Sequence, residues 1–380
     1  MEPELAGLRA DRVGERTIGN ARAARRRIEA TLDAVGAVIL AALTATVVLA
    51  SRGDRSAVIA LLWASVSVLV AARFTGKVQR TGPAIAVLTV ATFVTLDSWA
   101  ARSWTGLLDG PLPYENASGA FLAQAAFGGA LVAVSTRRIP VILAGALAGA
   151  AFGLAAMQAS TAAAVTLGLL LLVVAARIKR RWARPAVLVA SCLFLAVLAS
   201  TVLLGATFRG DEEDGGLRAR VYEALTDRRI ALWHDALSIL AERPGGVGPA
   251  RFDDVPPRLV DDPDAEWAHN EFLQQGAELG WAGLVLTVLL FLWGFARLWV
   301  HPVPDAALVV GAASLAALGI HASVDYILHF PAVPLTAAAI VGAAQAAKHR
   351  RSVGGREGPG EEGVEGGAHP AGVAGPPPSG

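Results

Sequence analysis

The sequence predicts an all-α fold: a bundle of about ten transmembrane helices, with one large, partly helical loop outside the cytoplasm between the seventh and eighth spans. Three observations lead to this prediction. Of the 380 residues, 54% are hydrophobic and only 17% are charged. The mean hydropathy is +0.50, which is too apolar for an ordinary soluble domain. The apolar residues also occur in long runs, and the charged residues cluster between them.

Ten apolar runs approach the length of about 20 residues that a helix needs to cross a membrane. They cover 32–51, 56–73, 83–99, 118–134, 138–157, 161–176, 185–207, 276–296, 304–321 and 331–347. We therefore expect a basic N-terminal arm over 1–31, seven spans over 32–207, an outer loop over 208–275, three spans over 276–347 and a tail over 348–380. The tail is rich in Gly, Pro and Glu and is predicted to be disordered.

Basic residues between the runs predict the orientation, because short cytoplasmic loops are enriched in Arg and Lys. With the Arg-rich arm inside, the short inner loops carry eleven basic residues and the short outer loops carry three. Both termini are therefore predicted to be cytoplasmic, and the first run is expected to stay as a membrane anchor. The inner residues are Arg73, Lys77, Arg80, Arg137, Arg138, Arg177, Lys179, Arg180, Arg181, Arg184 and Arg297, and the outer ones are Arg52, Arg55 and Arg102.

A smaller outer loop covers about 100–117. It carries Tyr114, and its end overlaps Asn116-Ala-Ser118, which matches a glycosylation sequon. The motif is short and frequent, so it carries little weight.

The last outer loop contains His321, Asp325 and His329 at four-residue spacing, which would align them on a helix. The two histidines would then lie two turns apart, too far for one zinc ion. Four carboxylates over 211–214 lack the spacing of a calcium loop and are better interpreted as a solvated linker. No metal site is predicted, and Asp325 is expected to line an outer cavity.

The large outer loop begins with an amphipathic helix over Leu217–Glu242. Arg229 lies within its apolar stripe. An arginine there needs an anionic partner, or it must extend to the lipid head groups, and periodicity leaves both possibilities open. The stripe consists of Val221, Leu225, Leu232, Trp233, Leu237 and Leu240.

A proline and clustered glycines end this helix at Arg243-Pro-Gly-Gly-Val-Gly-Pro249. Such residues stop regular structure and let the backbone approach a ligand closely. The segment lacks the lysine of a P-loop and follows a helix rather than a strand, so nucleotide binding is not indicated.

His269 follows, and a helix is expected to start near it. Asn270, Gln274 and Glu278 would share one face of that helix. Glu278 would lie near the outer membrane surface, where an ionisable residue suggests function. His269 is a candidate general base, because its charge changes near neutral pH, although a lone histidine is also often structural.

These motifs together resemble the O-antigen ligase and polymerase superfamily of bacterial membrane glycan transferases. The resemblance covers roughly Arg228 to Pro331, and the N-terminal half is similar only in its repeated spans. The motifs are Arg229-x-x-x-Trp233 with Ala236-Leu237, Pro244-Gly-Gly-Val-Gly248 with Phe252, His269-Asn270 with Leu273, Glu278-Leu-Gly280 with Gly283, and His321-x-x-x-Asp325 with Leu328 and Pro331.

The resemblance implies transfer of a glycan from a polyprenyl-diphosphate carrier to an acceptor hydroxyl, at the outer face of the bacterial cytoplasmic membrane. It implies that Arg229 binds the diphosphate and that His269 activates the acceptor, without cofactor, metal or nucleic acid. The acceptor is a glycan, a lipid or a protein. Further candidates for substrate binding are Arg220, Arg243, Arg251, Trp233, Asn270, Glu278 and Asp325.

Two alternatives remain: a solute transporter, and a non-catalytic protein of envelope assembly. A transporter should carry ionisable residues at the bilayer midplane and interrupted spans. The predicted spans are nearly free of charge. The spacing of Gly145, Gly149 and Gly153 is better explained by close helix packing.

Overall fold

The structure is a computed structural model that describes residues 2–50, 56–78, 81–101, 111–160, 163–207, 227–255, 266–302 and 304–346. It contains no β-strand in these ranges, which confirms the all-α class. The helices are α1 (Glu2–Ala50), α2 (Ser56–Val78), α3 (Thr81–Ala101), α4 (Glu115–Ser135), α5 (Ile139–Ala159), α6 (Ala163–Ile178), α7 (Ala183–Ala206), α9 (Asp227–Glu242), α10 (Glu271–Trp299), α11 (Ala306–Ala322) and α12 (Ala332–Ala344), with 3₁₀ turns η1 (Arg180–Trp182) and η3 (Ile327–His329).

The chain divides into two compact units, Met1–Ala347 and Lys348–Gly380. All the helices belong to the first. The predicted disordered tail lies outside the described residues, as do the carboxylates of 211–214.

A helix coincides with each of the ten predicted apolar runs. Among the described residues, six helices are long and apolar enough to cross a membrane, within α1, α3, α4, α5, α7 and α10. Shorter apolar helical stretches cover Leu61–Thr75, Ala306–Ala322 and Ala332–Ala344. The chain is therefore a multi-pass helical protein by its described residues, and the count of ten crossings stays a prediction.

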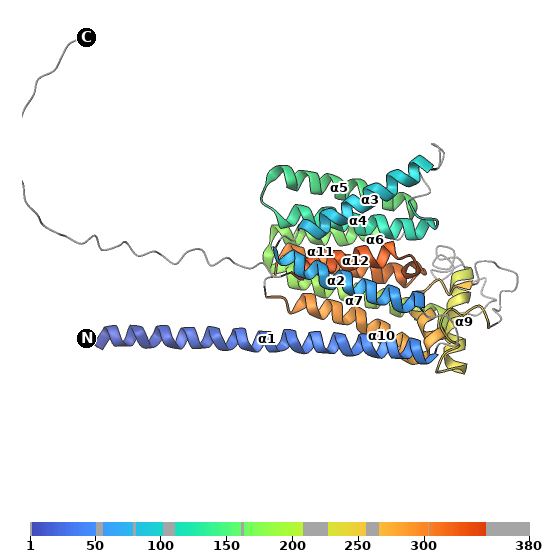
Figure 1. The fold of residues 1–380 in the computed structure, drawn as a ribbon, viewed down its shortest axis with the longest axis horizontal. Coiled ribbons are helices and arrows are strands. Elements are labelled where there is room, and N and C mark those ends of the chain that lie inside the picture. Colours follow the sequence, from blue (N-terminus) through green and yellow to red (C-terminus); the bar gives the residue numbers. More distant parts are fainter. Residues whose placement is uncertain are drawn as a thin grey trace, which may run out of the picture. The chain divides into compact units, whose positions relative to one another are not determined.

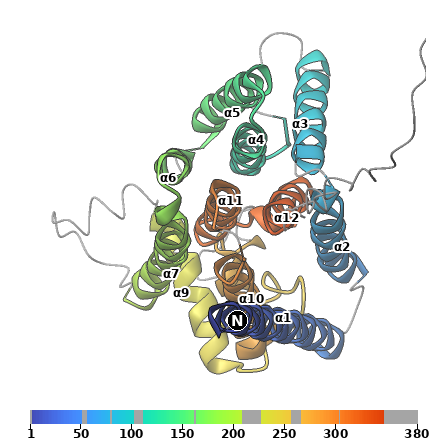
Figure 2. The same ribbon diagram turned by 90° about the vertical axis from the view of Figure 1, so that its left-hand side faces the viewer.

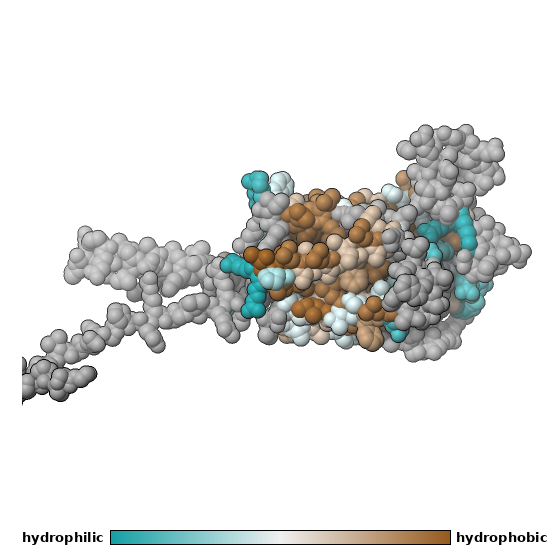
Figure 3. Space-filling view, turned by 90° about the horizontal axis from the view of Figure 1, so that it is seen from above, coloured by the Kyte–Doolittle hydropathy of each residue, from teal (hydrophilic) through white to brown (hydrophobic). Residues whose placement is uncertain are grey.

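The helices of the first unit run side by side, and α9 lies across one end of them (Figure 1). The end-on view places α11 among the other helices (Figure 2), and nearly all of its residues are buried. Large apolar side chains face outward along the bundle, including Phe93 and Leu147, which are 74% and 71% exposed. They contribute to an apolar band between more hydrophilic ends (Figure 3), as expected where lipid covers the protein.

Basic residues gather at the end of the bundle opposite α9. There Arg73 Nη1 lies 3.1 Å from Asp33 Oδ1, and Arg297 Nε lies 3.3 Å from the same oxygen. Arg138, at the start of α5, falls at this end too, because successive helices alternate in direction. The predicted charge bias thus maps to one end of the bundle. Which side of the membrane that end faces stays a prediction.

Glycines allow α4 and α5 to pack closely. A Cβ added at Gly129 would lie 2.5 Å from the backbone nitrogen of Gly149, and one added at Gly145 would lie 2.8 Å from the Gly129 carbonyl. No side chain fits between backbones at this distance. The predicted packing role is therefore confirmed for Gly145 and Gly149. It does not hold for Gly153, where an added Cβ would make only an ordinary contact of 3.9 Å with Ala126.

The glycine-rich segment after α9 packs against a bend in α10. Gly280 has φ 71° and interrupts the helix. Trp281 N donates to Pro244 O at 3.1 Å, and Gly248 N donates to Glu278 O at 2.8 Å. We expected these glycines to let the backbone approach a ligand. In the structure, the backbone that they approach is that of α10.

We predict that Gly280→Ala destabilises the fold. Alanine adopts a positive φ poorly, and its Cβ would lie 2.1 Å from Pro244 O. The cost should be about 2 kcal/mol or more. The measurement is thermal unfolding in detergent. Gly245→Ala is the matched control, because a Cβ there meets nothing within 4 Å. Equal unfolding temperatures for the two variants would contradict the prediction.

Candidate functional site

The site is organised around the carboxylate of Asp325, which lies in the turn between α11 and η3 and is 1% exposed. Its Oδ1 accepts a hydrogen bond from His269 Nδ1 at 3.1 Å and one from Tyr326 N at 2.8 Å. Its Oδ2 lies 3.2 Å from Arg229 Nη2. The two residues singled out from the sequence therefore meet on opposite oxygens of one buried carboxylate.

Two further side chains bind Oδ2 from the start of α4. Tyr114 donates its hydroxyl at 2.6 Å, and Asn116 donates its amide at 2.5 Å. Asn116 also donates to the Tyr114 hydroxyl at 3.1 Å. Asn116, which the sequence analysis noted only as part of a sequon, is thus half-buried and bound to Asp325. These residues lie more than 200 positions before their partner, so local sequence patterns gave no sign of the contact.

The surroundings of Asp325 favour the ionised form of its carboxyl group. Burial alone would raise the pKa of Asp325, but the hydrogen bond from His269 and the charge of Arg229 outweigh it and hold that pKa below its usual range. Burial and the adjacent carboxylate raise the pKa of Tyr114, so its hydroxyl stays protonated as a donor. Asp325 is therefore an acceptor surrounded by donors.

The position of His269 is defined by its backbone. It has φ 47°, a conformation that few residues other than glycine adopt. Trp233 of α9 donates its indole N–H to His269 O at 3.0 Å and is fully buried. A buried indole presents no face to a sugar in this structure. Its contact instead holds the histidine backbone.

Asn270 begins α10. Its side-chain oxygen caps the helix by accepting from Phe272 N and Leu273 N, and its amide donates to Thr201 at 3.0 Å. The helix expected near His269 thus starts at Glu271, two residues later. His269 precedes it and does not share a helical face with Leu273. Asn270 is fully buried, and its polar atoms are engaged within the protein.

The predicted polar stripe continues from Gln274 to Glu278. Gln274 donates to Glu278 Oε1 at 2.9 Å and accepts from Ala268 N at 3.0 Å. Glu278 Oε2 accepts from Ala250 N at 3.0 Å. Glu278 therefore ties the segment after α9 to α10. In the described ranges, no contact joins it directly to Asp325.

Of the remaining basic candidates, the two that the structure describes, Arg243 and Arg251, do not meet at the site. Arg220 lies outside the described residues. Arg243 is exposed at the end of α9. Arg251 forms an ion pair with Asp254, which takes up its charge.

A set of stacked aromatic rings lies beside Asp325, and the sequence analysis did not predict it. Tyr114 stacks on Tyr326 with centroids 4.9 Å apart and on Phe330 at 5.6 Å. Trp267 stacks on Tyr326 at 5.5 Å with 14° between the planes. Each of these rings is half-buried, and the edge of His269 faces Tyr326 at 5.0 Å. Half-exposed flat rings beside a histidine provide a surface on which a sugar can stack.

The expected helical alignment of His321, Asp325 and His329 is wrong, because α11 ends at Ala322 and a turn follows. The ring of His321 instead contacts Ser160 at 3.3 Å. No cluster of His, Cys, Asp and Glu that could hold a metal occurs in the described parts of the chain.

His329 pairs with buried Glu271, at 3.2 Å between Nδ1 and Oε2. The sequence did not indicate this pair. Burial lowers the pKa of His329, but the charges of Glu271 and Glu278 and the hydrogen bond to the Tyr326 carbonyl outweigh it and raise that pKa to about 9. A cationic imidazole thus lies against Trp267, with ring centroids 4.2 Å apart.

The raised pKa of His329 gives a test by pH. A histidine whose pKa rises from 6.5 to about 9 on folding stabilises the fold below pH 6.5, and this stabilisation is lost as pH rises through 9. The unfolding temperature of wild type, compared with that of His329→Gln, should therefore fall over that interval. Parallel pH profiles for the two proteins would exclude the charged pair. Glu271→Gln should behave like His329→Gln.

Fold and site together define a helical membrane protein in which His269 and Arg229 meet on the buried carboxylate of Asp325 at one end. Comparison with protein families matches residues 144–288 to the O-antigen ligase family. No curated protein and no solved structure matches the chain. The match supports the resemblance to the O-antigen ligase-like superfamily seen in the motifs, and it indicates a membrane enzyme that transfers glycosyl groups. It includes Arg229 and His269 and ends before Asp325.

Proposed function

We propose that this protein is an O-antigen ligase-like glycosyltransferase that moves a glycan from a polyprenyl diphosphate to an acceptor hydroxyl, at the outer face of the bacterial cytoplasmic membrane. The observation that carries the proposal is the shared carboxylate: Asp325 binds His269 at 3.1 Å on one oxygen and Arg229 at 3.2 Å on the other. A candidate base and a candidate diphosphate ligand thus lie on either side of one fixed group.

His269 is suited to remove the proton of the acceptor. Asp325 can only accept, so Nδ1 of the neutral imidazole carries the proton and Nε2 keeps its lone pair. In the described parts of the chain, no hydrogen bond engages Nε2. The acceptor oxygen attacks the anomeric carbon, and its proton passes to Nε2. Asp325 stabilises the resulting imidazolium, as a carboxylate does in a catalytic triad.

Arg229 is suited to stabilise the leaving group. As the bond from the anomeric carbon to the diphosphate oxygen breaks, negative charge grows on the diphosphate. A fixed guanidinium favours that charge more in the transition state than in the ground state. Arg229 has five N–H donors, and its side chain remains 26% exposed. One donor can hold Asp325 while others bind phosphate oxygens.

Aromatic and buried residues complete the proposed site. Trp267 and Tyr326 offer stacking surface to a sugar ring of donor or acceptor. Trp233 and Asn270 act through His269, one by binding its carbonyl oxygen and the other by starting the helix that follows it. Their part is positioning rather than contact with the glycan.

Alanine substitutions test the two central roles. We expect Arg229→Ala and His269→Ala each to lower release of polyprenyl diphosphate by about 10²–10⁴-fold. The assay supplies a lipid-linked oligosaccharide, the host's acceptor fraction and a chelator. Arg138→Ala, at the opposite end of the bundle, is the control and should match wild type. Folding is checked by size-exclusion and thermal unfolding. Folded variants as active as wild type, or a wild type that releases nothing from any donor, would overturn the assignment and favour the transporter.

The Asp–His unit has its own test. Asp325→Asn keeps the shape but removes the charge and allows the wrong imidazole tautomer, so we expect a loss of about 10²–10⁴-fold in turnover. Residues that act as one unit are not additive. Because Asp325 also holds Arg229, the double variant with His269→Ala should be slower than His269→Ala alone, but by less than the loss that Asp325→Asn causes in the wild type. Multiplied losses would show that Asp325 acts independently of His269.

A further inference from the structure

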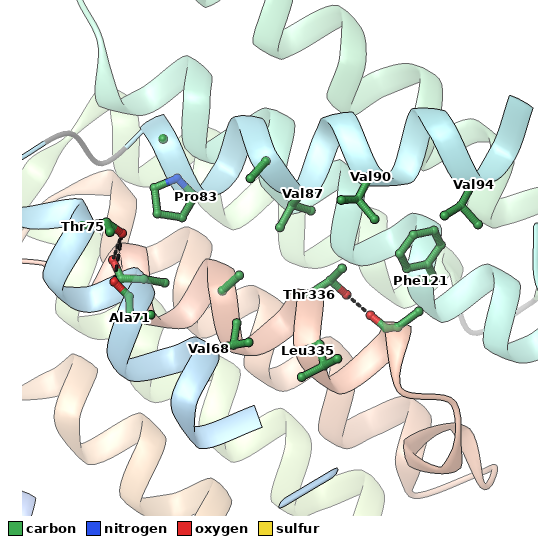
Figure 4. Close-up of a pocket in the computed structure, with 15 residues that line it drawn as sticks. Val68, Ala71, Thr75, Pro83, Val87, Val90, Val94, Phe121, Leu335 and Thr336 are labelled. Atoms are coloured by element: carbon green, nitrogen blue, oxygen red, sulfur yellow. Dashed lines mark hydrogen bonds between the residues drawn. The ribbon is translucent and has the colours of Figure 1, made fainter. Parts of the chain in front are cut away.

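A long apolar groove lies between α2, α3 and α12, with Phe121 of α4 at one end (Figure 4). Its volume is about 830 Å³. Thr75 and Thr336 are its polar side chains, and both hydroxyls donate to carbonyls of their own helices, at 2.9 and 2.6 Å. Val90 in the lining is 51% exposed, so the groove opens to the surroundings of the bundle. Its lining side chains offer hydrocarbon contacts and no unpaired hydroxyl donor.

The groove runs along the helices. Its lining on α3 extends from Gly82 to Val94, a distance of about 18 Å at the helical rise of 1.5 Å per residue. Thr75 and Pro83 mark the end towards the basic residues, and Val94 and Phe121 mark the other end (Figure 4). An extended hydrocarbon chain lying in it would be parallel to the spans, as the chains of a bilayer are.

The second end of the groove adjoins the Asp325 cluster. Ala332, a lining residue, lies two positions after Phe330. Phe330 stacks on Tyr114 at 5.6 Å, and Tyr114 donates to Asp325. The apolar groove thus ends beside the cluster that contains the cation Arg229. This combination suits an amphiphile with a hydrocarbon chain and an anionic head group.

A second groove does not end beside the Asp325 cluster. It holds about 350 Å³ between α1 and α10 and is lined by residues such as Arg27 and Trp299. Those residues lie at the opposite end of the bundle, near Arg297. A lipid seated there could not place its head group at Arg229.

We propose that the groove between α2, α3 and α12 holds the hydrocarbon chain of the donor lipid while its diphosphate lies at Arg229. This inference rests on the proposed function. Bilayer lipid is as apolar as the groove, so moving the chain from the bilayer into the groove adds little binding free energy. Its effect is to orient the donor, because a chain fixed along the spans limits the positions of its head group. Correct placement of a reacting group is a large part of catalysis.

Filling the groove tests the inference. Ala86→Trp on α3 and Ala339→Phe on α12 place bulk in the lining. Ala146→Trp, on the exposed face of α5, adds the same bulk elsewhere. Each variant is assayed with the glycan diphosphate on a full-length polyprenyl chain and on a two-isoprene chain. We expect kcat/KM for the long donor to fall about 10–100-fold in the groove variants, the scale of a misplaced reactant. The short donor should be affected less than threefold, and Ala146→Trp should match wild type.

The outcomes separate the two proposals. A wild type that turns over neither donor removes the proposed function, and the groove assignment falls with it. Turnover of the long donor that is unchanged by either groove variant overturns the groove assignment alone. If both donors lose activity equally, crosslinking of a diazirine-bearing polyprenyl diphosphate to wild type decides. Labelled peptides from α3 or α12, absent with a diazirine phospholipid, support the groove, and labels elsewhere overturn it.

Discussion

A carboxylate that is almost fully removed from water needs charge and hydrogen-bond partners, because an unpaired buried charge costs several kcal/mol. Asp325 meets this need with four side chains from three other parts of the chain: Tyr114 and Asn116 at the start of α4, Arg229 in α9 and His269 before α10. The ends of α4, α9, α10 and α11 are therefore held together by one group. The contacts that stabilise the charge also fix the geometry on which the proposed chemistry depends.

The backbone around the cluster is unusually constrained. His269 has a positive φ. The indole of Trp233 binds its carbonyl oxygen, and the next residue, Asn270, caps α10. The segment that follows α9 packs against the bend at Gly280. Glu278 accepts a hydrogen bond from that segment, and Gln274 accepts one from the backbone of residue 268. Strain of this kind persists only where the surroundings over-determine it. These contacts hold the His269 backbone in a strained conformation and direct its imidazole to Asp325.

Patterns within single helices were the predictable part. Ten apolar runs became helices, and the packing glycines of α5 followed from their spacing. Arg229 was flagged because a charge in an apolar stripe is anomalous, and its partner is Asp325. The unforeseen contacts of Tyr114, Asn116 and the Glu271–His329 pair join residues distant in the chain, and no local period encodes them. The glycines of 245–248 were recognised as permitting close approach, but the sequence did not show that the approaching backbone was α10.

The dependence on Asp325 has a consequence for biosynthesis. Chains emerge from the ribosome N-terminus first. Tyr114 and Asn116 are made early, and Arg229 and His269 follow, yet their common acceptor is encoded after α11. Until that turn packs, the cation Arg229 and the candidate base His269 have no carboxylate to orient them. A nascent chain stalled before α11 would already contain Arg229 and His269 but not the group that unites them. Assembly order thus delays formation of the Asp325 cluster until the bundle is nearly complete.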